Sequence, residues 1–227
     1  MNKTVSNQYT GKNGEDYHKK VHSVPEPANK WIANHRKRKI SIYIKENDNV
    51  LEYGVGMGWN IMSLKNSTKI GYDIALNLSN ILEEHGIHFV SNINELKESS
   101  FDVVICHHVI EHVSNPPIVL ADIHRLLRKE GKLLLFVPYE KEKVYRKYNP
   151  NEPNQHLYSW NVQTLGKLVE LNGYKVITGK IREFGYDRFA SIWADKLKIG
   201  EKGFLILKKI FHFIRPRKEV FILAVKI

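Results

Sequence analysis

The sequence predicts an α/β fold in which a mostly parallel sheet carries helices on both faces. Short apolar runs alternate with helical segments, and the first run, Val50–Tyr53, leads into a glycine-rich turn. Strands of a parallel sheet are buried on both faces, so they are continuous apolar runs. The expected strands are residues 50–53, 69–73, 88–91, 101–106, 132–137, 174–182 and 220–226.

The segments between these runs favour helices. Ser159 is a typical N-cap residue, and Gly173 provides a C-terminal stop for the helix between them. The expected helices are residues 28–46, 60–65, 76–85, 117–128, 160–172 and 202–214.

Length and composition are typical of one compact enzyme domain. The chain has 227 residues and a single cysteine, Cys106, which excludes an internal disulfide. It opens with no hydrophobic signal segment, and no apolar stretch reaches the length of a membrane span. The cytoplasm is therefore the expected location.

Positive charge is concentrated in two places. The net charge is +11, with one basic cluster at residues 30–39 and a second between residues 196 and 226, where nine Lys or Arg face two Glu. Such charge indicates an anionic partner, which is a nucleic acid, a phosphorylated or diphosphate-linked substrate, or an acidic membrane surface. A solvated basic surface with no partner is an equal alternative.

The most informative segment is the turn after the first strand. Glu52 closes the apolar run, and Gly54, Gly56 and Gly58 follow at every second position, unlike the G-x-G-x-x-G spacing of dinucleotide folds. A carboxylate beside the loop repels phosphate and attracts a cation. The loop therefore favours S-adenosylmethionine, whose sulfonium and ammonium are positive, over a pyrophosphate. Asp73, at the end of the second strand, fits either cofactor.

Several segments together resemble the class I S-adenosylmethionine-dependent methyltransferases, in the broad group that includes ubiquinone-biosynthesis and sugar-modifying enzymes. The resemblance covers about residues 48–182 and rests on segments 50–58, 71–73, 101–113, 115–116, 131–138 and 156–159. It implies a Rossmann-like seven-stranded sheet of order 3-2-1-4-5-7-6 with the last strand antiparallel. Residues 48–227 would form this domain, with a basic helical insertion at 183–219. Residues 1–47 would form an N-terminal helical segment or lid that includes Tyr9 and Tyr17.

The same resemblance implies cofactor-binding roles. Backbone at the three glycines would approach the methionine and ribose, and Glu52 would lie near the amino end. Asp73 would accept hydrogen bonds from the ribose hydroxyls. Asn92 stands where the family often has an acid for the adenine amino group. The remaining expected contacts are Ile93 on the adenine face and His107 and His108 under the methionine chain.

Methyl transfer to a hydroxyl is helped by a base, and two histidines are candidates. His112 follows Glu111 after the fourth strand, and His156 would face the cleft from the opposite wall. A purely structural role for His112 is the alternative. Some quinone-pathway relatives bind a divalent metal through E-x-x-E-H, but here His108 replaces the first carboxylate. A His/Glu/His metal site is an alternative by ligand type, but we expect no metal.

The segment 202–214 is amphipathic at helical spacing. Phe204, Leu207, Phe211 and Ile214 share one face, and Lys208, Lys209 and His212 are expected opposite. Packing on the sheet is one interpretation, and contact with an anionic membrane or lipid-linked substrate is the other.

The sequence therefore predicts a cytoplasmic S-adenosylmethionine-dependent methyltransferase that acts on oxygen. Its acceptor would be a small molecule or an anionic carrier-linked sugar or lipid. Two alternatives come from other classes: an RNA methyltransferase or basic RNA-binding module, and a nicotinamide-dependent oxidoreductase. The chain has no appended nucleic-acid domain and no third dinucleotide glycine, so neither nucleic acid nor a nicotinamide cofactor is the expected partner.

Overall fold

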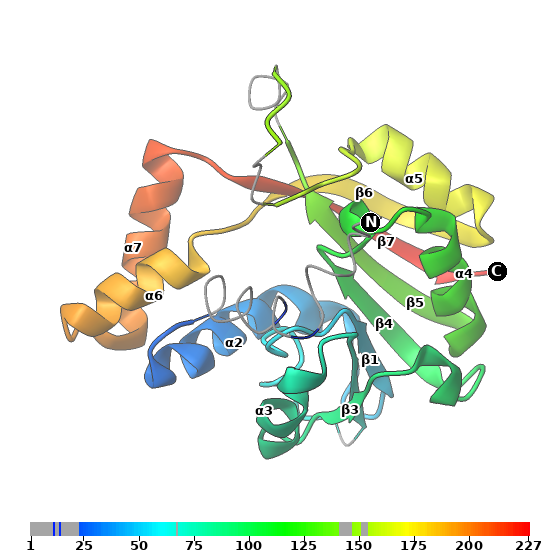
Figure 1. Ribbon diagram of the computed structural model, residues 1–227, viewed down its shortest axis with the longest axis horizontal. Coiled ribbons are helices and arrows are strands. Elements are labelled where there is room, and N and C mark those ends of the chain that lie inside the picture. Colours follow the sequence, from blue (N-terminus) through cyan, green and yellow to red (C-terminus); the bar gives the residue numbers. More distant parts are fainter. Residues whose placement is uncertain (1–10, 12–13, 15–22, 67, 141–146, 151–153) are drawn as a thin grey trace.

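A computed structural model describes residues 11, 14, 23–66, 68–140, 147–150 and 154–227. Its centre is a seven-stranded sheet flanked by helices (Figure 1). The strands are β1 (Val50–Tyr53), β2 (Lys69–Tyr72), β3 (His88–Val90), β4 (Phe101–His107), β5 (Leu127–Pro138), β6 (Tyr174–Glu183) and β7 (Lys218–Lys226). The α-helices are α2 (Glu26–Ile40), α3 (Ser79–Glu84), α4 (Pro116–Leu126), α5 (Val162–Leu171), α6 (Asp187–Lys196) and α7 (Gly200–Ile214). Short 3₁₀ helices include η4 (Ile93–Glu95) and η5 (Ile110–His112).

The sheet order is β3-β2-β1-β4-β5-β7-β6, as the sequence predicts. The strands β1 to β5 run parallel, and β7 is antiparallel to both of its neighbours. Because β7 runs the other way, its first residues lie at the carboxyl edge of the parallel strands. Glu219 is paired there with Pro138, the last residue of β5.

The core has two layers because adjacent residues of a strand point to opposite faces. Leu133 and Leu135 of β5 pack in the layer that holds α4 and α5. Leu134 and Phe136 pack in the other layer, together with α3 and the end of α2. Both faces of the sheet are therefore apolar and covered, which is why the strands are continuous apolar runs in the sequence.

The helices α6 and α7 form a hairpin that stands apart from α4 and α5, at the left of Figure 1. Between β6 and β7 the insertion thus contains two helices, whereas the sequence predicted one. A third apolar cluster joins the hairpin to α2 and consists of Ile32, Trp59, Ala190, Ala194 and Phe204. None of the helices built from the described residues is long and apolar enough to cross a membrane.

The predicted helix at 60–65 is wrong, because residues 59–63 form turns and residues 64–65 have no regular structure. Polar side chains there bond to other parts of the chain instead of following a helix face. Asn60 donates to the carboxylate of Glu52, and Asn66 donates to the carbonyl oxygens of Lys45 and Asp48. The turns therefore hold the segment against β1.

Two boundaries also differ from the prediction. The helix α4 ends at Leu126, and β5 begins directly at Leu127, five residues before the predicted start. The N-cap of α5 is Asn161, not Ser159, because the Asn161 side chain accepts from the Thr164 N–H at 2.9 Å in a capping box.

Candidate functional site

The glycine-rich turn after β1 is left-handed at each of its three glycines, with φ values of 75°, 49° and 70° at Gly54, Gly56 and Gly58. A Cβ atom on Gly54 would lie 2.3 Å from the Val109 side chain, and one on Gly58 would lie 2.7 Å from Ile87. A Cβ atom on Gly56 would meet nothing within 4 Å. Gly54 and Gly58 are thus required by packing within the protein, and Gly56 is the glycine that faces open space.

Asp73 holds this turn in place from the end of β2. One carboxylate oxygen accepts the Gly56 N–H at 2.9 Å, and the other accepts the Ala75 N–H at 3.0 Å. The Asp73 N–H donates to the carbonyl oxygen of Val90 at the end of β3. The carboxyl ends of β1, β2 and β3 therefore meet around one half-buried carboxylate.

Glu52 is a buried acid under the turn, with 1% of its surface exposed. Oε1 accepts from Asn60 at 2.5 Å, and Oε2 has no hydrogen-bond partner among the described residues. Burial raises the pKa of Glu52 to about 8, against the lowering effect of the Asn60 hydrogen bond. A cation beside the unpartnered oxygen would relieve this cost.

Asn92 follows β3 and begins η4, where its side-chain oxygen accepts the Asn94 N–H at 3.1 Å. The side chain is exposed, and one lone pair of its oxygen is already used by this cap. Ile93, the next residue, is half-buried and packs against the main core cluster.

His107, the last residue of β4, stacks on His108, which follows the strand, with ring centroids 4.4 Å apart and planes at 4°. Consecutive strand residues normally point to opposite faces, but a φ of 58° at His108 brings both rings to the same side. Their Nε2 atoms lie 3.3 and 3.4 Å from the same oxygen of Glu219. Burial alone would raise the pKa of Glu219, but the two histidines lower it to about 2. Burial and His108 lower the pKa of His107 to about 4.

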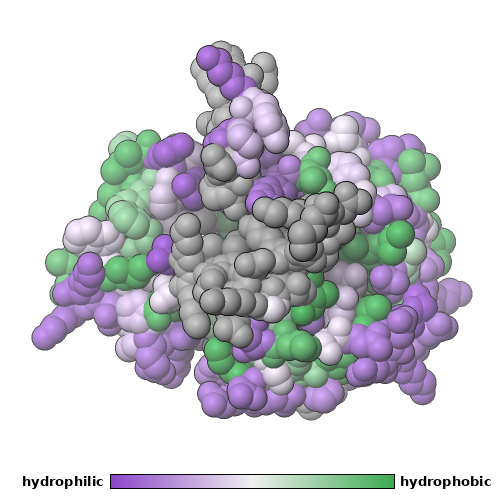
Figure 2. All heavy atoms as spheres, viewed as in Figure 1, coloured by the Kyte–Doolittle hydropathy of each residue, from purple (hydrophilic) through white to green (hydrophobic). Residues whose placement is uncertain are grey.

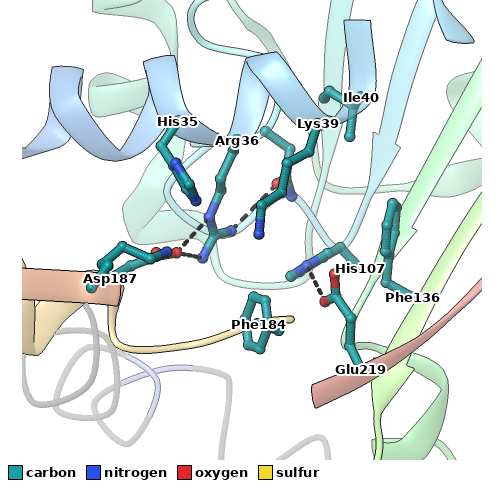
Figure 3. A pocket seen from close by; sticks show the side chains of 11 residues that line it. His35, Arg36, Lys39, Ile40, His107, Phe136, Phe184, Asp187 and Glu219 are labelled. Carbon is teal, nitrogen blue, oxygen red and sulfur yellow. Dashed lines mark hydrogen bonds and ion pairs between the residues drawn. The ribbon is translucent and has the colours of Figure 1, made fainter. Parts of the chain in front are cut away.

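A polar pocket lies beside His107 between α2 and the α6–α7 hairpin (Figure 3). Asp187 pairs there with Arg36 at 3.0 Å and with Lys208. Burial would raise the pKa of Asp187, but these two cations hold it far below its usual range. The prediction that Lys208 lies on the exposed face of its helix is therefore wrong, and His212 is buried as well.

The third cation of this pocket is Lys39, whose side chain points into it between Arg36 and His107 (Figure 3). Its ammonium donates to the carbonyl oxygen of Glu183. Burial, followed by the neighbouring Lys208, lowers the pKa of Lys39. The pocket thus combines three cationic side chains with two acids, Asp187 and Glu219.

A chain of contacts joins this pocket to the glycine turn. Arg36 bonds to Asp187 and donates to the side-chain oxygen of Asn60 at 3.4 Å, and Asn60 in turn donates to Glu52. The arginine also lies over the Trp59 and Phe184 rings, 5.3 and 5.7 Å from their centroids. The two ends of the site are therefore connected by buried polar groups.

The predicted candidate bases, His112 and His156, are brought together by the fold. Their ring centroids are 4.8 Å apart in an edge-to-face arrangement. His156 Nδ1 lies 2.6 Å from a carboxylate oxygen of Glu140, near the end of β5. Glu111 is buried beside them, and its backbone oxygen accepts the Leu157 N–H at 2.8 Å.

The two histidines differ in their electrostatic surroundings. Burial, His156 and His108 together lower the pKa of His112 to about 3, so its imidazole is neutral at neutral pH. His156 has a carboxylate on Nδ1, an arrangement that orients the ring.

Among the described residues, two groups of side chains have donor atoms close enough to hold a metal ion. They are His107, His108 and Glu219, and Glu111, His112 and His156, each with donor atoms within 4.8 Å of one another. The cations of the polar pocket lie beside the first group and oppose a divalent ion there. The expectation that the protein uses no metal stays a prediction.

The residues at the glycine turn fit a cationic nucleoside. Gly56 faces open space, Asp73 presents a carboxylate at its edge, and Glu52 offers an unpartnered buried oxygen. A pyrophosphate would be repelled by the Asp73 carboxylate, whereas a cation would favour the ionised form of Glu52.

Comparison with known proteins decides the family. A family model described as a methyltransferase domain matches residues 27–178, which is more than half of the chain. The chain belongs to the class I S-adenosylmethionine-dependent methyltransferases. A relative from Methanocaldococcus jannaschii, an uncharacterised protein, is 29% identical over 192 residues, covering 78% of this chain and 75% of the relative.

Solved structures share the fold of this methyltransferase at low sequence identity. A magnesium protoporphyrin IX methyltransferase from Synechocystis, with bound S-adenosylhomocysteine, has a TM-score of 0.64 at 12% identity and 98% coverage of both chains. A Thermotoga maritima S-adenosylmethionine-dependent methyltransferase has a TM-score of 0.62 at 17% identity and 95% coverage of both chains. The phosphoethanolamine N-methyltransferase 2 of Haemonchus contortus has a TM-score of 0.60 at 18% identity. That alignment covers 93% of this chain but 59% of the enzyme.

Sequence reasoning missed most residues of the polar pocket and its connections: Arg36, Asn60, Glu140, Phe184, Asp187, Lys208 and Glu219. One signal was available for Glu219, an acid at the start of an apolar strand that the family places antiparallel. Such an acid must lie at the carboxyl edge of the sheet. The predicted lid residues Tyr9 and Tyr17 lie outside the described residues.

Proposed function

We propose that this methyltransferase transfers a methyl group to a hydroxyl oxygen of a small-molecule acceptor, with His156 as the base. The observation that carries the proposal is the 2.6 Å contact between His156 Nδ1 and Glu140. A carboxylate on Nδ1 fixes the tautomer, so the lone pair resides on Nε2 and accepts a proton there.

The bound cofactor would supply a methyl group already activated by its sulfonium. The chain then has to align the acceptor oxygen and exclude water, which can supply roughly 7–11 kcal/mol of the barrier. His156 would take the hydroxyl proton as the oxygen attacks, and Glu140 would stabilise the imidazolium that forms. A positioned base contributes about 10²–10⁴-fold to the rate.

The cofactor contacts follow from the geometry of the glycine turn. Glu52 would pair with the ammonium through its unpartnered oxygen, and Asp73 would accept the ribose hydroxyls beside Gly56. Asn92 and Ile93 would contact the adenine, with the second lone pair of the Asn92 oxygen as acceptor. His107 and His108 would form the wall under the methionine chain.

The acceptor would carry an anionic group, as a carrier-linked sugar or lipid does. The polar pocket supports this class because one carboxylate, that of Asp187, is shared by two cations, Arg36 and Lys208, and does not neutralise both of them. Lys39 is held among cations and bonds to a backbone carbonyl, so an anion would be stabilised beside it. The Haemonchus contortus enzyme was solved with phosphomonomethylethanolamine, an acceptor that bears a phosphate.

The test measures S-adenosylhomocysteine formation with four classes of acceptor: nucleotide-diphosphate sugars, polyprenyl-phosphate sugars, phosphoethanolamine and RNA. We expect turnover with a hydroxyl-bearing anionic sugar, and none with the same sugar after its phosphates are removed. Transfer confined to the amine of phosphoethanolamine would contradict oxygen methylation. Transfer confined to RNA, with steep salt dependence, would instead favour the nucleic-acid alternative.

A further inference from the structure

The helix α7 has apolar side chains on two sides: Phe204 is buried in the third apolar cluster, with Leu207 and Phe211 packed against it, and a second apolar side faces outward. Lys208 is buried at the polar pocket and His212 is buried beside Tyr186, whereas other large apolar side chains of α7 face outward. Phe213 is 90% exposed and Ile206 is 58% exposed, and Ile210 and Ile214 lie beside them. A soluble surface helix normally buries its apolar side chains, so this exposed side calls for a partner.

The neighbouring helix α6 extends the same apolar surface. Phe189, Trp193 and Leu197 recur at four-residue spacing and are all exposed. The Phe189 ring lies 4.9 Å from the Phe211 ring, so the apolar stripes of the two helices adjoin. We call the combined surface the α6–α7 face. Figure 2 shows green apolar residues gathered over these helices, at the left of the molecule, with purple hydrophilic residues around them.

The charges around this face are of one sign. The acids between residues 187 and 218, which are Asp187, Asp195 and Glu201, are buried or half-buried. The exposed basic residues of this stretch are Arg188, Lys196, Lys198, Lys202, Lys209, Arg215, Arg217 and Lys218. An aromatic and aliphatic surface with a basic margin matches the interface of an anionic lipid bilayer, where apolar side chains insert and cations meet the headgroups.

We propose that the α6–α7 face docks on the surface of an anionic membrane. The hairpin that would touch the lipid also contributes Asp187 and Lys208 to the polar pocket. Docking would therefore bring the acceptor site to substrates carried in the bilayer. The delivery of the acceptor site to bilayer substrates rests on the proposed function, whereas membrane binding itself does not depend on it.

A second copy of the chain fits the face less well. A twofold contact would place the same basic margin of both copies side by side, and like charges in a low-dielectric contact are destabilising. Anionic headgroups would neutralise these charges.

The experiment is co-sedimentation of the full chain with phosphatidylcholine vesicles, prepared with and without phosphatidylglycerol. We expect binding to the anionic vesicles that weakens as salt is raised. The double substitution Ile206→Ser with Phe213→Ser should lower the partition coefficient by about tenfold or more, because two large apolar side chains no longer insert. Lys209→Glu should lower it by about fivefold through charge.

The matched control is Leu171→Ser, which removes an equally exposed apolar side chain from α5, outside the α6–α7 face. It should leave vesicle binding unchanged. Calorimetric binding of S-adenosylhomocysteine checks that each variant is folded and separates a failed docking surface from a failed methyltransferase assignment.

Three results would overturn the proposal. The first is that the wild type does not bind anionic vesicles. The second is that Leu171→Ser lowers vesicle binding as much as the double substitution Ile206→Ser with Phe213→Ser does. The third is that light scattering shows a dimer, which this double substitution dissociates. The last result would assign the face to a second copy.

Discussion

The two ends of the site are built in different ways. At the cofactor end, backbone groups of consecutive loops meet around Asp73, and the chain that forms them is continuous from β1 to η4. At the acceptor end, charged side chains from α2, α6, α7 and β7 form the pocket. The Arg36–Asp187 pair alone joins residues 151 positions apart.

The two constructions suit two kinds of ligand: a cofactor whose structure is constant and an acceptor whose structure differs between enzymes. A turn made of backbone and one carboxylate can hardly change without losing its geometry, which suits a cofactor common to many enzymes. A pocket made of side chains can change its charge and shape by single substitutions, which suits an acceptor particular to one enzyme. Asn60 connects the two ends because it bonds to both Arg36 and Glu52.

The largest expected effect lies in the acceptor half. With an acceptor from the panel above, His156→Gln should lower kcat by about 10²–10⁴-fold, because the hydroxyl loses its proton acceptor. Glu140→Gln should lower it less, because the ring remains but its imidazolium is stabilised less. Steady-state kinetics measures the effect on kcat, and calorimetry measures the affinity for the cofactor separately.

The cofactor half should not respond to these changes. Affinity for S-adenosylhomocysteine should stay within about twofold of the wild type, as it should in the control His85→Gln, at the exposed C-cap of α3. A His156 variant with unchanged kcat and an unchanged pH profile of kcat would contradict the role of His156 as the base.

The next largest effect concerns stability. Asp187→Asn leaves Arg36 and Lys208 buried without their carboxylate, and should lower the free energy of unfolding by about 3 kcal/mol. The folded-state pKa of Asp187 is lowered, so its contribution is present above the ordinary pKa and is lost as pH falls through the folded value. Urea titrations at neutral and at acidic pH measure the difference.

The control for this substitution is Asp195→Asn on the same helix, which should change stability by less than about 0.5 kcal/mol. Equal stability of Asp187→Asn and the wild type at neutral pH would mean that the hairpin is held by its apolar contacts alone. The two halves of the site would then be less connected than the Asn60 contacts indicate.

The smallest expected effect is at the cofactor half and depends on pH. The pKa of Glu52 is raised to about 8 in the fold, so its contribution to stability is present below its ordinary value near 4.5. That contribution is lost as pH rises through 8. Glu52→Gln keeps an acceptor for Asn60 but does not ionise, so it should be more stable than the wild type by about 1–2 kcal/mol at pH 9.

At pH 5 the wild type and Glu52→Gln should have similar midpoints of thermal unfolding. The same substitution should weaken S-adenosylmethionine binding, because the ammonium loses its carboxylate. A stability difference that is constant from pH 5 to pH 9 would contradict burial as the cause.

The same contrast explains what the sequence could predict. The strand positions, the glycine turn and the position of Asp73 follow from apolar runs and local motifs, and the family resemblance implies the sheet order, so all of these were predicted correctly. His112 and His156 were proposed for opposite walls, and the fold brings their rings together. The turns at 60–65 were mistaken for a helix because Asn60 bonds to Glu52, a contact that spacing does not reveal.

The polar pocket could not be predicted, because it depends on how α6 and α7 pack against α2. Lys208 and His212 were expected to face solvent, since charged residues on a helix usually do. Both are buried instead, and Asp187 provides the counter-charge of Lys208. Phe204 on the predicted apolar face is buried too, and the outward apolar side is formed by Ile206, Ile210 and Phe213. Amphipathic spacing identifies two sides of a helix but does not say which side is covered.

The central claim is that the acid-flanked glycine turn binds the adenosyl cofactor, and calorimetry tests it most directly. S-adenosylmethionine should bind with one molecule per chain, and NADH should not bind. Asp73→Ala should weaken the binding by about 30-fold or more, through loss of the ribose contacts and of the turn's support. The exposed control Glu84→Gln should bind as the wild type does. Unchanged affinity in Asp73→Ala, with the protein still folded, would contradict the account.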